Sequence, residues 1–295
     1  MTHPAESGAV ASWPAPAKLN LFLHIVGRRS DGMHELQTLF QFIDWCDQLW
    51  FNVREDSEIV HLNPLPGVSA ATDLCVRAAV LLQQYSGSRA GVDIHIDKQL
   101  PMGGGIGGGS SDAATTLVAL NRLWQLHLDT GTLAGLGLQL GADVPVFVCG
   151  QAAWAEGVGE RLTPVAPVES WFLVIKPDCE VPTGQIFNAA DLTRSTPPMT
   201  IRDFLAADNQ RLPGHNDCEP VARRQFPAVA EALDWLNQFA PARMTGTGAC
   251  VFARFETEAD ACAVVEKYPD TSRIHCARGL NTSPLLQRLA MEDKL

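Results

Sequence analysis

The sequence predicts an α+β protein made of two domains, and three observations lead to this fold class. A chain of 295 residues can bury a substantial core and more often forms two domains than one. Both halves contain strand-like and helix-like segments, without the regular alternation that would predict a doubly wound sheet. Pro164 and Pro167 precede an apolar segment at 171–175, and such prolines are typical of a connection between units. We therefore expect a first domain over residues 1–165 and a second over residues 166–295.

The first strand already carries two polar residues of interest. Apolar and polar residues alternate over 17–27, which predicts a strand with Lys18 and Asn20 on the face opposite Leu19 and Leu21. The later elements follow from the same periodicities and from Gly and Pro breaks. They are a strand over 35–45, a helix over 72–84, a strand over 92–96, helices over 111–125 and 132–140, a strand over 171–175, a helix near 218–238, a strand after 249 and a helix over 257–267.

The composition excludes several classes of partner. No apolar run approaches the roughly 18–20 residues that span a bilayer, and the N-terminal residues show no secretory signal, so we expect no membrane association. A formal net charge of −11 opposes general binding to nucleic acid. The eight cysteines are scattered, without a C-x-x-C pair, and are typical of buried thiols in a reducing cytoplasm.

A glycine-rich segment predicts a site for a phosphorylated ligand. Six of the seven residues from Gly103 to Gly109 are glycine, and Ser110 and Ser111 follow at the start of a predicted helix. Glycine lets backbone N–H groups approach a ligand closely, and a helix N-terminus adds unpaired N–H groups and a positive dipole end. These features together favour phosphate binding. The two serines could cap the helix or contact the ligand, and both roles are compatible.

The same segment leaves alternatives open. Gly103-x-Gly105-x-x-Gly108 satisfies the dinucleotide fingerprint of NAD- or FAD-dependent oxidoreductases, but the match is weak within so many glycines. The acidic residue about 20 positions later, Asp129, lies in a polar turn and not at a strand end. The Walker pattern fails because Ser110 stands where a lysine is required. A non-catalytic nucleotide-binding module and a purely structural loop are the remaining interpretations.

Two further segments contain candidate functional residues. Asp143 follows a predicted helix C-terminus, where the dipole disfavours a carboxylate, and Pro145 prevents an easy helical continuation. An acid in such a place is a hint of catalytic use. Thr245-Gly246-Thr247-Gly248 is a second small-residue loop, which either forms a tight turn or brings backbone close to the ligand.

Several of these segments together resemble one family. Pro16–Asn20, Pro101–Ser111 and Thr245–Gly248 occur in this order, and Asp31–His34, Gly141–Pro145 and Asn216–Cys218 lie between them. The combined pattern spans nearly the whole chain and resembles the GHMP kinase superfamily of small-molecule kinases. The resemblance implies a ribosomal-protein-S5-like N-terminal domain and a ferredoxin-like C-terminal domain.

The resemblance also implies a reaction. Within the superfamily the match is to kinases that transfer the γ-phosphate of ATP, with Mg²⁺, to the 2-hydroxyl of a cytidine diphosphate methylerythritol in the non-mevalonate isoprenoid pathway. It implies a phosphotransferase with an alcohol acceptor that acts as a monomer or weak homodimer. A kinase of this superfamily that acts on another small alcohol is the alternative.

Residue roles come from the same resemblance. Lys18 and Asp143 match the catalytic pair, and no metal ligand is assigned. The ATP-binding positions are Lys98, Pro101, Met102, Gly103, Gly104, Gly105, Ile106, Gly107, Gly108, Gly109, Ser110 and Ser111. The substrate-binding positions are Asn20, Met33, His34, Phe187, Gly246 and Gly248. The chain departs from the family at Met33, where a tyrosine usually stacks on cytosine, and at Asp73, where an asparagine is commoner.

Overall fold

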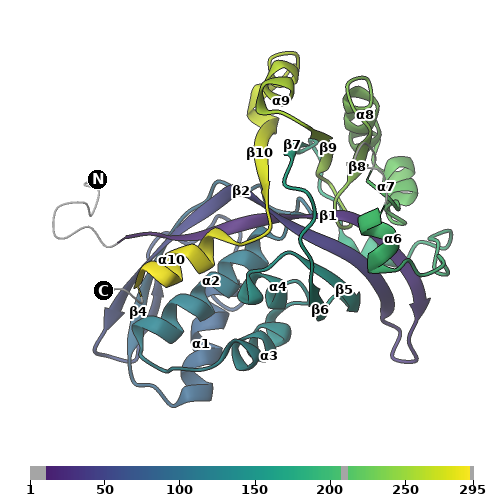
Figure 1. Cartoon of the computed structure of the whole chain (residues 1–295). Helices are drawn as coiled ribbons and strands as arrows, with labels where there is room; N and C mark the ends of the chain where they lie inside the picture. The colour runs from purple at the N-terminus through teal and green to yellow at the C-terminus, as the bar shows by residue number, and fades with distance from the viewer. Residues whose placement is uncertain (1–10, 207–211, 293–295) are drawn as a thin grey trace.

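Two long antiparallel strands, β1 (Trp13–Arg28) and β2 (His34–Arg54), run through the whole molecule and contribute to both of its halves (Figure 1). The computed structural model describes residues 11–206 and 212–292. The pairing of β1 with β2 shifts register at three places, after Pro16, after Asn20 and after Ile25. Such bulges bend a strand and re-aim its side chains. Lys18 and Asn20 lie between the first two of them.

The remaining elements are helices and shorter strands. In the first half they are β3 (Ile59–His61), α1 (Leu74–Ser86), β4 (Gly91–Asp97), α2 (Gly108–Leu123), α3 (Thr130–Leu140), α4 (Val144–Cys149), β5 (Ala153–Gly157) and β6 (Arg161–Pro164). In the second half they are β7 (Trp171–Ile175), α5 (Thr183–Phe187), α6 (Ile201–Ala206), α7 (Glu219–Gln225), α8 (Pro227–Leu236), β8 (Ala242–Met244), β9 (Val251–Phe255), α9 (Glu258–Val265), β10 (Ile274–Leu280) and α10 (Pro284–Glu292).

The strands form one continuous sheet that joins the two halves. Its main path runs in the order β3-β4-β2-β10-β7-β9-β8, and β1, β5 and β6 attach beside β2. All pairings between these strands are antiparallel except that of β3 with β4. The end of β10 crosses to β2 through the pairs Gly279–Ile43 and Leu280–Phe42. This short junction is what links the first sheet region to the second.

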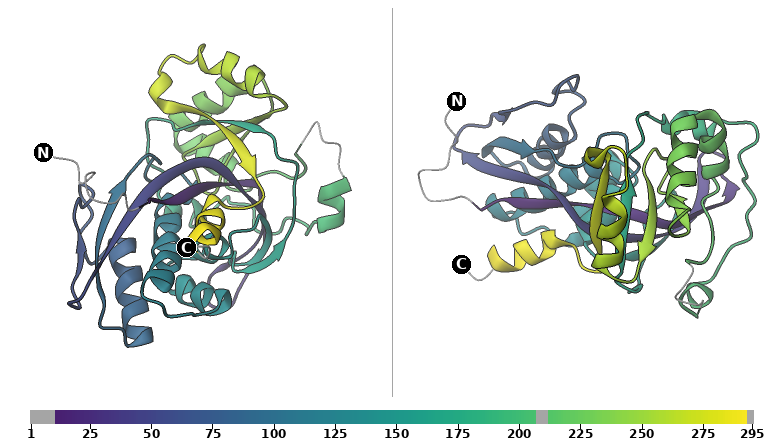
Figure 2. Two further views of the ribbon diagram at one scale, coloured as in Figure 1. Left: turned by 60° about the vertical axis from the view of Figure 1, so that its left-hand side comes forward. Right: turned by 90° about the horizontal axis from the view of Figure 1, so that it is seen from above.

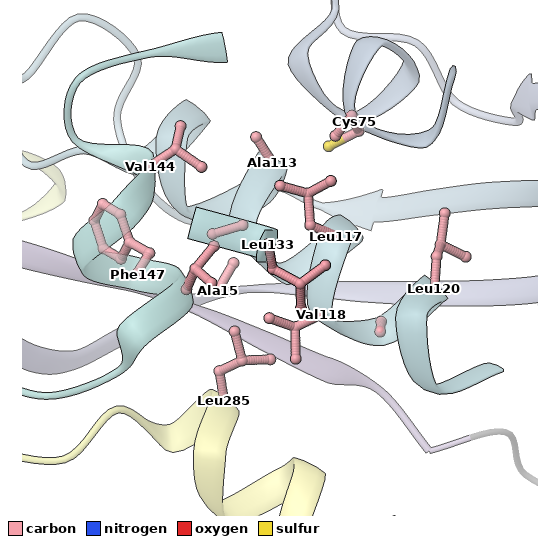
Figure 3. Close-up of a cluster of buried hydrophobic side chains, with 14 of the residues drawn as sticks. Ala15, Cys75, Ala113, Leu117, Val118, Leu120, Leu133, Val144, Phe147 and Leu285 are labelled. Atoms are coloured by element: carbon pink, nitrogen blue, oxygen red, sulfur yellow. The ribbon is translucent and has the colours of Figure 1, made fainter. Parts of the chain in front are cut away.

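Helices cover each sheet region and close two hydrophobic cores. In the first half, α1, α2, α3 and α4 lie on one side of the long strands (Figures 1 and 2). Their apolar residues, among them Leu117, Leu120, Val144 and Phe147, are buried against the sheet (Figure 3). In the second half, α8 and α9 cover the β10-β7-β9-β8 region, with Leu233 and Ala261 in that core. Within the described residues, no helix is long and apolar enough to cross a membrane.

The structure differs from the sequence-based expectations in several elements. The predicted helix near 218–238 is two helices, because Pro227 cannot donate the backbone bond that would continue α7. The helix after the glycine loop begins at Gly108, three residues before the predicted start. Elements that the periodicity did not predict are β3, β5, β6, β8, β10, α4, α5, α6 and α10. Most of them are short, and short elements carry little periodic signal.

The last helix packs against the first half of the chain. Leu285 of α10 is fully buried in the same core as Leu117 and Phe147 (Figure 3). The guanidinium of Arg288 lies 4.7 Å from the ring centroid of Trp13, and its Nε donates to the carbonyl of Ser12. The division at residue 165 stays a prediction, and the packing adds that residues from beyond it complete the first core.

Candidate active site

A cavity of about 550 Å³ lies where β1, the glycine loop and the second half of the chain meet. Most of the predicted site residues line it. They are Lys18, Asn20, Lys98, Pro101, Met102, Gly103, Gly104, Gly105, Gly107, Gly108, Gly109, Ser110, Asp143, Phe187 and Gly246. Residues about 230 positions apart in the sequence therefore contribute to one site.

Five predicted residues do not line this cavity. The side chain of Ile106 is buried in the hydrophobic cluster that also holds Leu100, where it anchors the glycine loop. Ser111 is buried within α2, and among the described residues its hydroxyl has no hydrogen-bond partner. Met33 is half-exposed in the turn between β1 and β2, and His34 follows it. Gly248 packs behind the cavity, where a Cβ would meet the sulfur of Met244 at 2.8 Å.

Lys18 and Asp143 form an ion pair at the centre of the cavity. Lys18 is 2% exposed, and its Nζ lies 3.3 Å from Asp143 Oδ2. The same ammonium donates to Asn20 Oδ1 over 2.6 Å and to the carbonyl of Gly105 over 3.0 Å. Three oxygen partners compensate the burial of this charge, which would otherwise be costly. Asp143 is 35% exposed and faces the cavity, so its carboxylate is open to a ligand.

The strand β1 places Lys18 through its own backbone contacts. The N–H of Lys18 donates to the carbonyl of Ile106, which ties β1 to the glycine loop. Asn20 is fixed by two more bonds, in which its Nδ2 donates to the hydroxyl of Thr38 and its backbone N–H donates to the hydroxyl of Thr245. Lys18 and Asn20 are thus held by the glycine loop, by β2 and by the loop that begins at Thr245.

Asp143 lies between two helices. As predicted, it follows a helix C-terminus, since α3 ends at Leu140. The place is nevertheless not unfavourable, because a new helix, α4, begins with Pro145 in its first turn and has Asp143 as its N-cap residue, where the positive end of the helix dipole favours a carboxylate. Its side chain makes no capping hydrogen bond and stays available to Lys18 and to the cavity.

The glycine loop presents the N-terminus of α2 to the cavity. Gly107, with φ of 78°, is the N-cap residue, and no side chain caps this end of the helix. The first helical bond is donated by Ser111 to the carbonyl of Gly107. The N–H groups before it have no helical acceptor and are available to an anion. The predicted capping role of Ser110 and Ser111 is therefore wrong, and Ser110 instead lines the cavity.

The second small-residue loop supports the glycine loop from behind. The N–H of Cys250 donates to the carbonyl of Gly104, and that of Ala249 to the carbonyl of Gly103. A Cβ on Gly105 would approach the carbonyl of Thr245 to 2.5 Å, so only glycine fits there without a shift. Close packing of two backbones is the reason for small residues at both positions.

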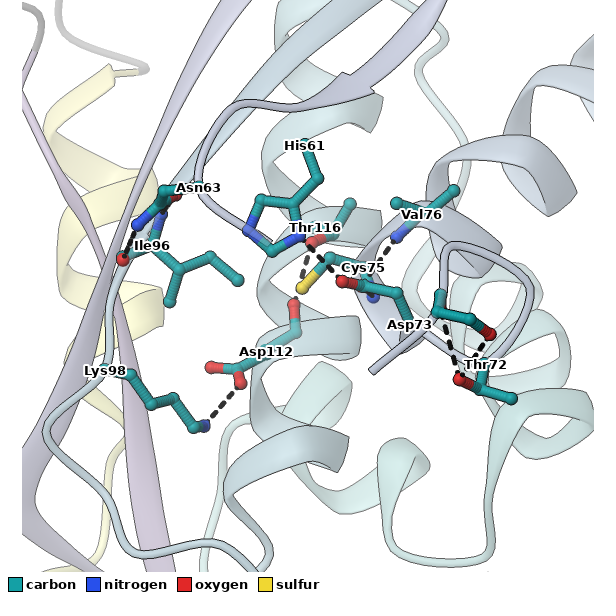
Figure 4. A network of polar contacts seen from close by, with 11 residues as sticks. His61, Asn63, Thr72, Asp73, Cys75, Val76, Ile96, Lys98, Asp112 and Thr116 are labelled. Atoms are coloured by element: carbon teal, nitrogen blue, oxygen red, sulfur yellow. Dashed lines mark hydrogen bonds and ion pairs between the residues drawn. The ribbon is translucent and has the colours of Figure 1, made fainter. Parts of the chain in front are cut away.

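A buried carboxylate, Asp47, organises the entry to the glycine loop and was missed by the sequence reasoning. Its Oδ1 accepts the backbone N–H groups of Gln99 and Leu100, over 2.6 and 2.7 Å. Its Oδ2 accepts a hydrogen bond from the ammonium of Lys98 over 2.5 Å. The same ammonium donates to Asp112 over 2.6 Å (Figure 4). Burial alone would lower the pKa of Lys98, but the two carboxylates outweigh it and raise the pKa above its usual value. The charged Lys98 therefore connects Asp47 to Asp112 of α2 through two ion pairs, and it also lines the cavity.

One end of the cavity is apolar and ends on Asp73. Leu65, Val68, Leu74 and Ile96 line this end. Asp73 caps α1, and its Oδ1 accepts the N–H groups of Cys75 and Val76. Its Oδ2 lies 2.7 Å from Nδ1 of His61, a residue of β3 whose side chain is buried (Figure 4). Although burial opposes it, these hydrogen bonds hold the pKa of Asp73 below its usual value, so the carboxyl is ionised. An apolar slot beside an acceptor group suits a purine base.

The opposite end of the cavity is formed by the second half of the chain and by the β1–β2 hairpin. Phe187, at the end of α5, lines this end together with Leu23 and Leu36. The ring of His34 stacks on Phe187, with centroids 5.0 Å apart and an interplanar angle of 22°. Lys18 and Asp143 lie between the two ends, beside the N-terminus of α2. The arrangement suits two ligands that meet at the centre of the cavity.

Comparison with known proteins decides the family. The profile described as GHMP kinases N terminal domain matches residues 73–151, and that described as GHMP kinases C terminal matches residues 201–273. The 4-diphosphocytidyl-2-C-methyl-D-erythritol kinase of Cupriavidus metallidurans is 58% identical over 273 residues, which cover 92% of this chain and 94% of that protein. The kinase of the same description from Nitrosococcus oceani is 56% identical over 94% of this chain and 97% of that protein.

The chain belongs to the 4-diphosphocytidyl-2-C-methyl-D-erythritol kinase family. A crystal structure of 4-(cytidine 5'-diphospho)-2C-methyl-D-erythritol kinase matches with a TM-score of 0.81 and 33% identity, over 91% of this chain and 99% of that one. The mevalonate kinase of Methanococcus jannaschii has a TM-score of 0.66 at 16% identity, which shows a shared fold. Membership in this kinase family confirms the predicted fold class and the predicted phosphotransferase activity toward an alcohol, and nothing supports the oxidoreductase alternative.

Proposed function

We propose that this protein transfers the γ-phosphate of ATP to the 2-hydroxyl of 4-diphosphocytidyl-2-C-methyl-D-erythritol, a step of the non-mevalonate isoprenoid pathway. The observation that supports this assignment is the ion pair of Lys18 and Asp143 beside the uncapped N-terminus of α2. The phosphates of ATP would bind the N–H groups of the glycine loop, with adenine in the apolar slot near Asp73. The cytidine end of the acceptor would bind near Phe187 and His34.

Lys18 and Asp143 would have different roles in phosphoryl transfer. This reaction depends mainly on positioning and on stabilisation of charge. Asp143 would accept the proton of the attacking hydroxyl late in the transfer, for which an ordinary carboxylate suffices. Lys18 would hold that carboxylate in place through the ion pair and offset the negative charge on the transferred group. Its three oxygen partners keep the ammonium in place before the substrates arrive.

The residues at the centre of the cavity fit a magnesium ion. Mg²⁺ at phosphoryl-transfer sites is held by one or two protein oxygens together with phosphate oxygens and water. The hydroxyl of Ser110 lines the cavity and lies 3.8 Å from the position of a Cβ on Gly141, near the turn that carries Asp143. Ser110 and Asp143 would hold the ion, which supplies neutralisation of phosphate charge. Among the described residues, no cluster of three or more His, Cys, Asp or Glu forms a metal site of its own.

We also propose that the protein works in the cytoplasm as a monomer or weak homodimer. All eight cysteines are free thiols, as expected in a reducing compartment.

The assignment is tested with a panel of alcohols. Purified protein is incubated with ATP, Mg²⁺ and one acceptor, and ADP release is followed in a coupled assay while phosphorus NMR identifies the product. 4-Diphosphocytidyl-2-C-methyl-D-erythritol is expected to give a kcat/KM at least about a hundredfold above that of mevalonate, homoserine or galactose. Preference for another alcohol would overturn the substrate, and ATP binding without ADP release would favour a non-catalytic module.

The Asp143→Asn variant tests the proposed base. Turnover is expected to fall by at least about a hundredfold, the usual scale for an acid–base group, while calorimetry shows ATP binding retained. Asp178→Asn is the matched control, because Asp178 is an exposed acid paired with Arg273. Near-normal turnover of Asp143→Asn would remove Asp143 from the role of base.

A further inference from the structure

An arginine outside the predicted site residues holds His34 in place. The Nε–H of Arg194 donates to Nε2 of His34 over 3.1 Å. The other guanidinium nitrogens donate to the carbonyls of Phe187, Ala189 and Leu192, over 2.7–3.0 Å. Arg194 therefore fixes the turn after α5 and the β1–β2 hairpin to each other at the acceptor end of the cavity.

The direction of the bond between Arg194 and His34 determines which ring nitrogen carries the proton. A guanidinium stays charged and offers only donors. Nε2 of His34 must therefore use its lone pair as an acceptor, so the proton of the neutral ring lies on Nδ1. Within residues 11–206 and 212–292, Nδ1 of His34 makes no hydrogen bond to the protein. The ring thus keeps one unused N–H donor.

The plane of the His34 ring is fixed as well. One edge is held by Arg194, and one face stacks on Phe187, whose side chain lines the cavity. An edge contact and a face contact together leave the imidazole little freedom to rotate. Its free donor then has a defined direction relative to Phe187.

We propose that Arg194 is a positioning residue for the acceptor substrate, which fixes His34 as the Nδ1–H tautomer against Phe187 so that the ring offers one N–H donor. The proposal rests on the proposed function, because it takes the acceptor to be a cytidine nucleotide. The pyrimidine edge of cytosine carries a carbonyl oxygen and a ring nitrogen, both of which accept hydrogen bonds. A protonated imidazole or the other tautomer would lose the bond from Arg194.

The charges around His34 also favour its neutral form. Burial lowers the pKa of His34 below its usual value, and the guanidinium groups of Arg194 and Arg28 lower it further. Arg194 comes from the segment after α5, and Arg28 is the residue paired with His34 on β1. Loss of Arg194 would remove one of these causes, so the pKa of His34 would rise, while burial and Arg28 would still hold it below its usual value.

The kinetic test uses Arg194→Met beside Arg224→Met. Arg194→Met is expected to raise the KM for the cytidine acceptor about tenfold, because a fixed donor is lost, with kcat and the KM for ATP changed less than about twofold. As the pH is lowered, the KM of this variant should also begin to change at a higher pH than that of the unmodified enzyme, because loss of the Arg194 charge raises the pKa of His34. Arg224, which pairs with Asp191 on the surface of the same half, should tolerate the change. An effect on kcat or on the KM for ATP alone would overturn the positioning role.

Two further measurements separate positioning from a merely structural role. Long-range proton–nitrogen NMR spectra of the free enzyme report the tautomer of His34 without any substrate, and they are expected to show the proton on Nδ1. A proton on Nε2 overturns the inference whatever the substrate is, and the result stands even where Arg194→Met fails to fold. In a His34→Gln background, Arg194→Met should change the acceptor KM less than about twofold. An undiminished effect there would show that Arg194 does not act through His34. Failure of the proposed function would instead appear as no turnover of the cytidine acceptor by the unmodified enzyme.

Discussion

Lys18 illustrates how much support a buried charge needs. The residue is 2% exposed, and its ammonium has three oxygen partners and the ring of Phe40 at 5.2 Å. Charges in such surroundings persist only where hydrogen bonds replace the lost water. Because the oxygen partners come from β1, the glycine loop and the turn before α4, and Phe40 comes from β2, the position of the ammonium depends on the whole site.

Replacement of Lys18 is therefore expected to affect turnover more than binding. Lys18→Ala should reduce kcat by at least about a hundredfold, since Asp143 loses its partner and the transferred phosphoryl group loses a fixed cation. Lys18→Met, which keeps most of the buried stem, should give a similar loss. Lys267→Ala serves as the control, because Lys267 lies over Phe239 in the second half. A loss below about tenfold in the steady-state assay would contradict a direct role for Lys18.

Met33 is a residue-scale test of base recognition. It is 51% exposed at the tip of the β1–β2 hairpin, next to His34. Met33→Tyr is expected to lower the KM for the cytidine acceptor about three- to tenfold, because an aromatic ring stacks on the base more favourably than a thioether. Met291→Tyr makes the same change at another exposed methionine and should leave this KM unchanged. Unchanged or weaker binding in Met33→Tyr would show that the turn does not meet the base.

At the scale of elements, the glycine loop is shaped by the groups behind it as well as by its ligand. A Cβ on Gly107 would meet the ring of Phe147 at 2.7 Å and Cε of Lys18 at 3.2 Å. Gly107 also has a φ of 78°, which costs a side-chain-bearing residue about 1–2 kcal/mol. The loop, α4 and β1 are therefore mutually dependent.

Gly107→Ala tests that dependence. It is expected to reduce kcat at least about tenfold and to lower the melting temperature, because Phe147 and Lys18 must both move. Gly87→Ala is the control, since Gly87 has a φ of 68° at the C-cap of α1 but nothing within 4 Å of its added Cβ. It should lower stability by about 1–2 kcal/mol and leave kcat unchanged. Equal kcat losses in the two variants would argue against the packing explanation.

The sequence predicted those elements and residues that carry a local signal. Regular apolar spacing predicted α2 to within three residues, and the run of glycines predicted a phosphate-binding loop. Asp47 carries no such signal, because it lies three residues from another aspartate, Asp44, in a strand of mixed character. Only the fold shows that Asp47 is buried under the glycine loop while Asp44 is not. Arg194, between a threonine and a serine in an irregular segment, was missed for the same reason.

The periodicity of the sequence could not predict the pairing of Lys18 with Asp143 either. The two residues are 125 positions apart, and their role as a pair was predicted from the family resemblance alone. Long-range contacts of this kind are fixed by topology, here by the bulges in β1 and the turn between α3 and α4. Their catalytic roles stay predictions that the variants above test.

At the scale of the whole molecule, the two halves share strands and the last helix. β1 and β2 pass from one half to the other, and the cavity lies between these halves. The helix α10 then returns to the first core, where Leu285 is fully buried. Its neighbour Leu286 lies against Gly150, where a Cβ would meet its side chain at 2.4 Å. Stability of the first half should therefore depend on residues near the C-terminal end of the described chain.

Leu285→Ala measures how strongly α10 supports the first core. Removing a fully buried leucine side chain is expected to lower the free energy of unfolding by about 2–5 kcal/mol, since the sheet and helices around it relax only partly into the cavity. Met291→Ala, at a 61% exposed position of the same helix, should change it by less than about 0.5 kcal/mol. Denaturant unfolding followed by tryptophan fluorescence reports on the first core through Trp13 and Trp124, which belong to it. If Leu285→Ala lowered the free energy of unfolding no more than Met291→Ala, the packing of α10 would not stabilise the first core.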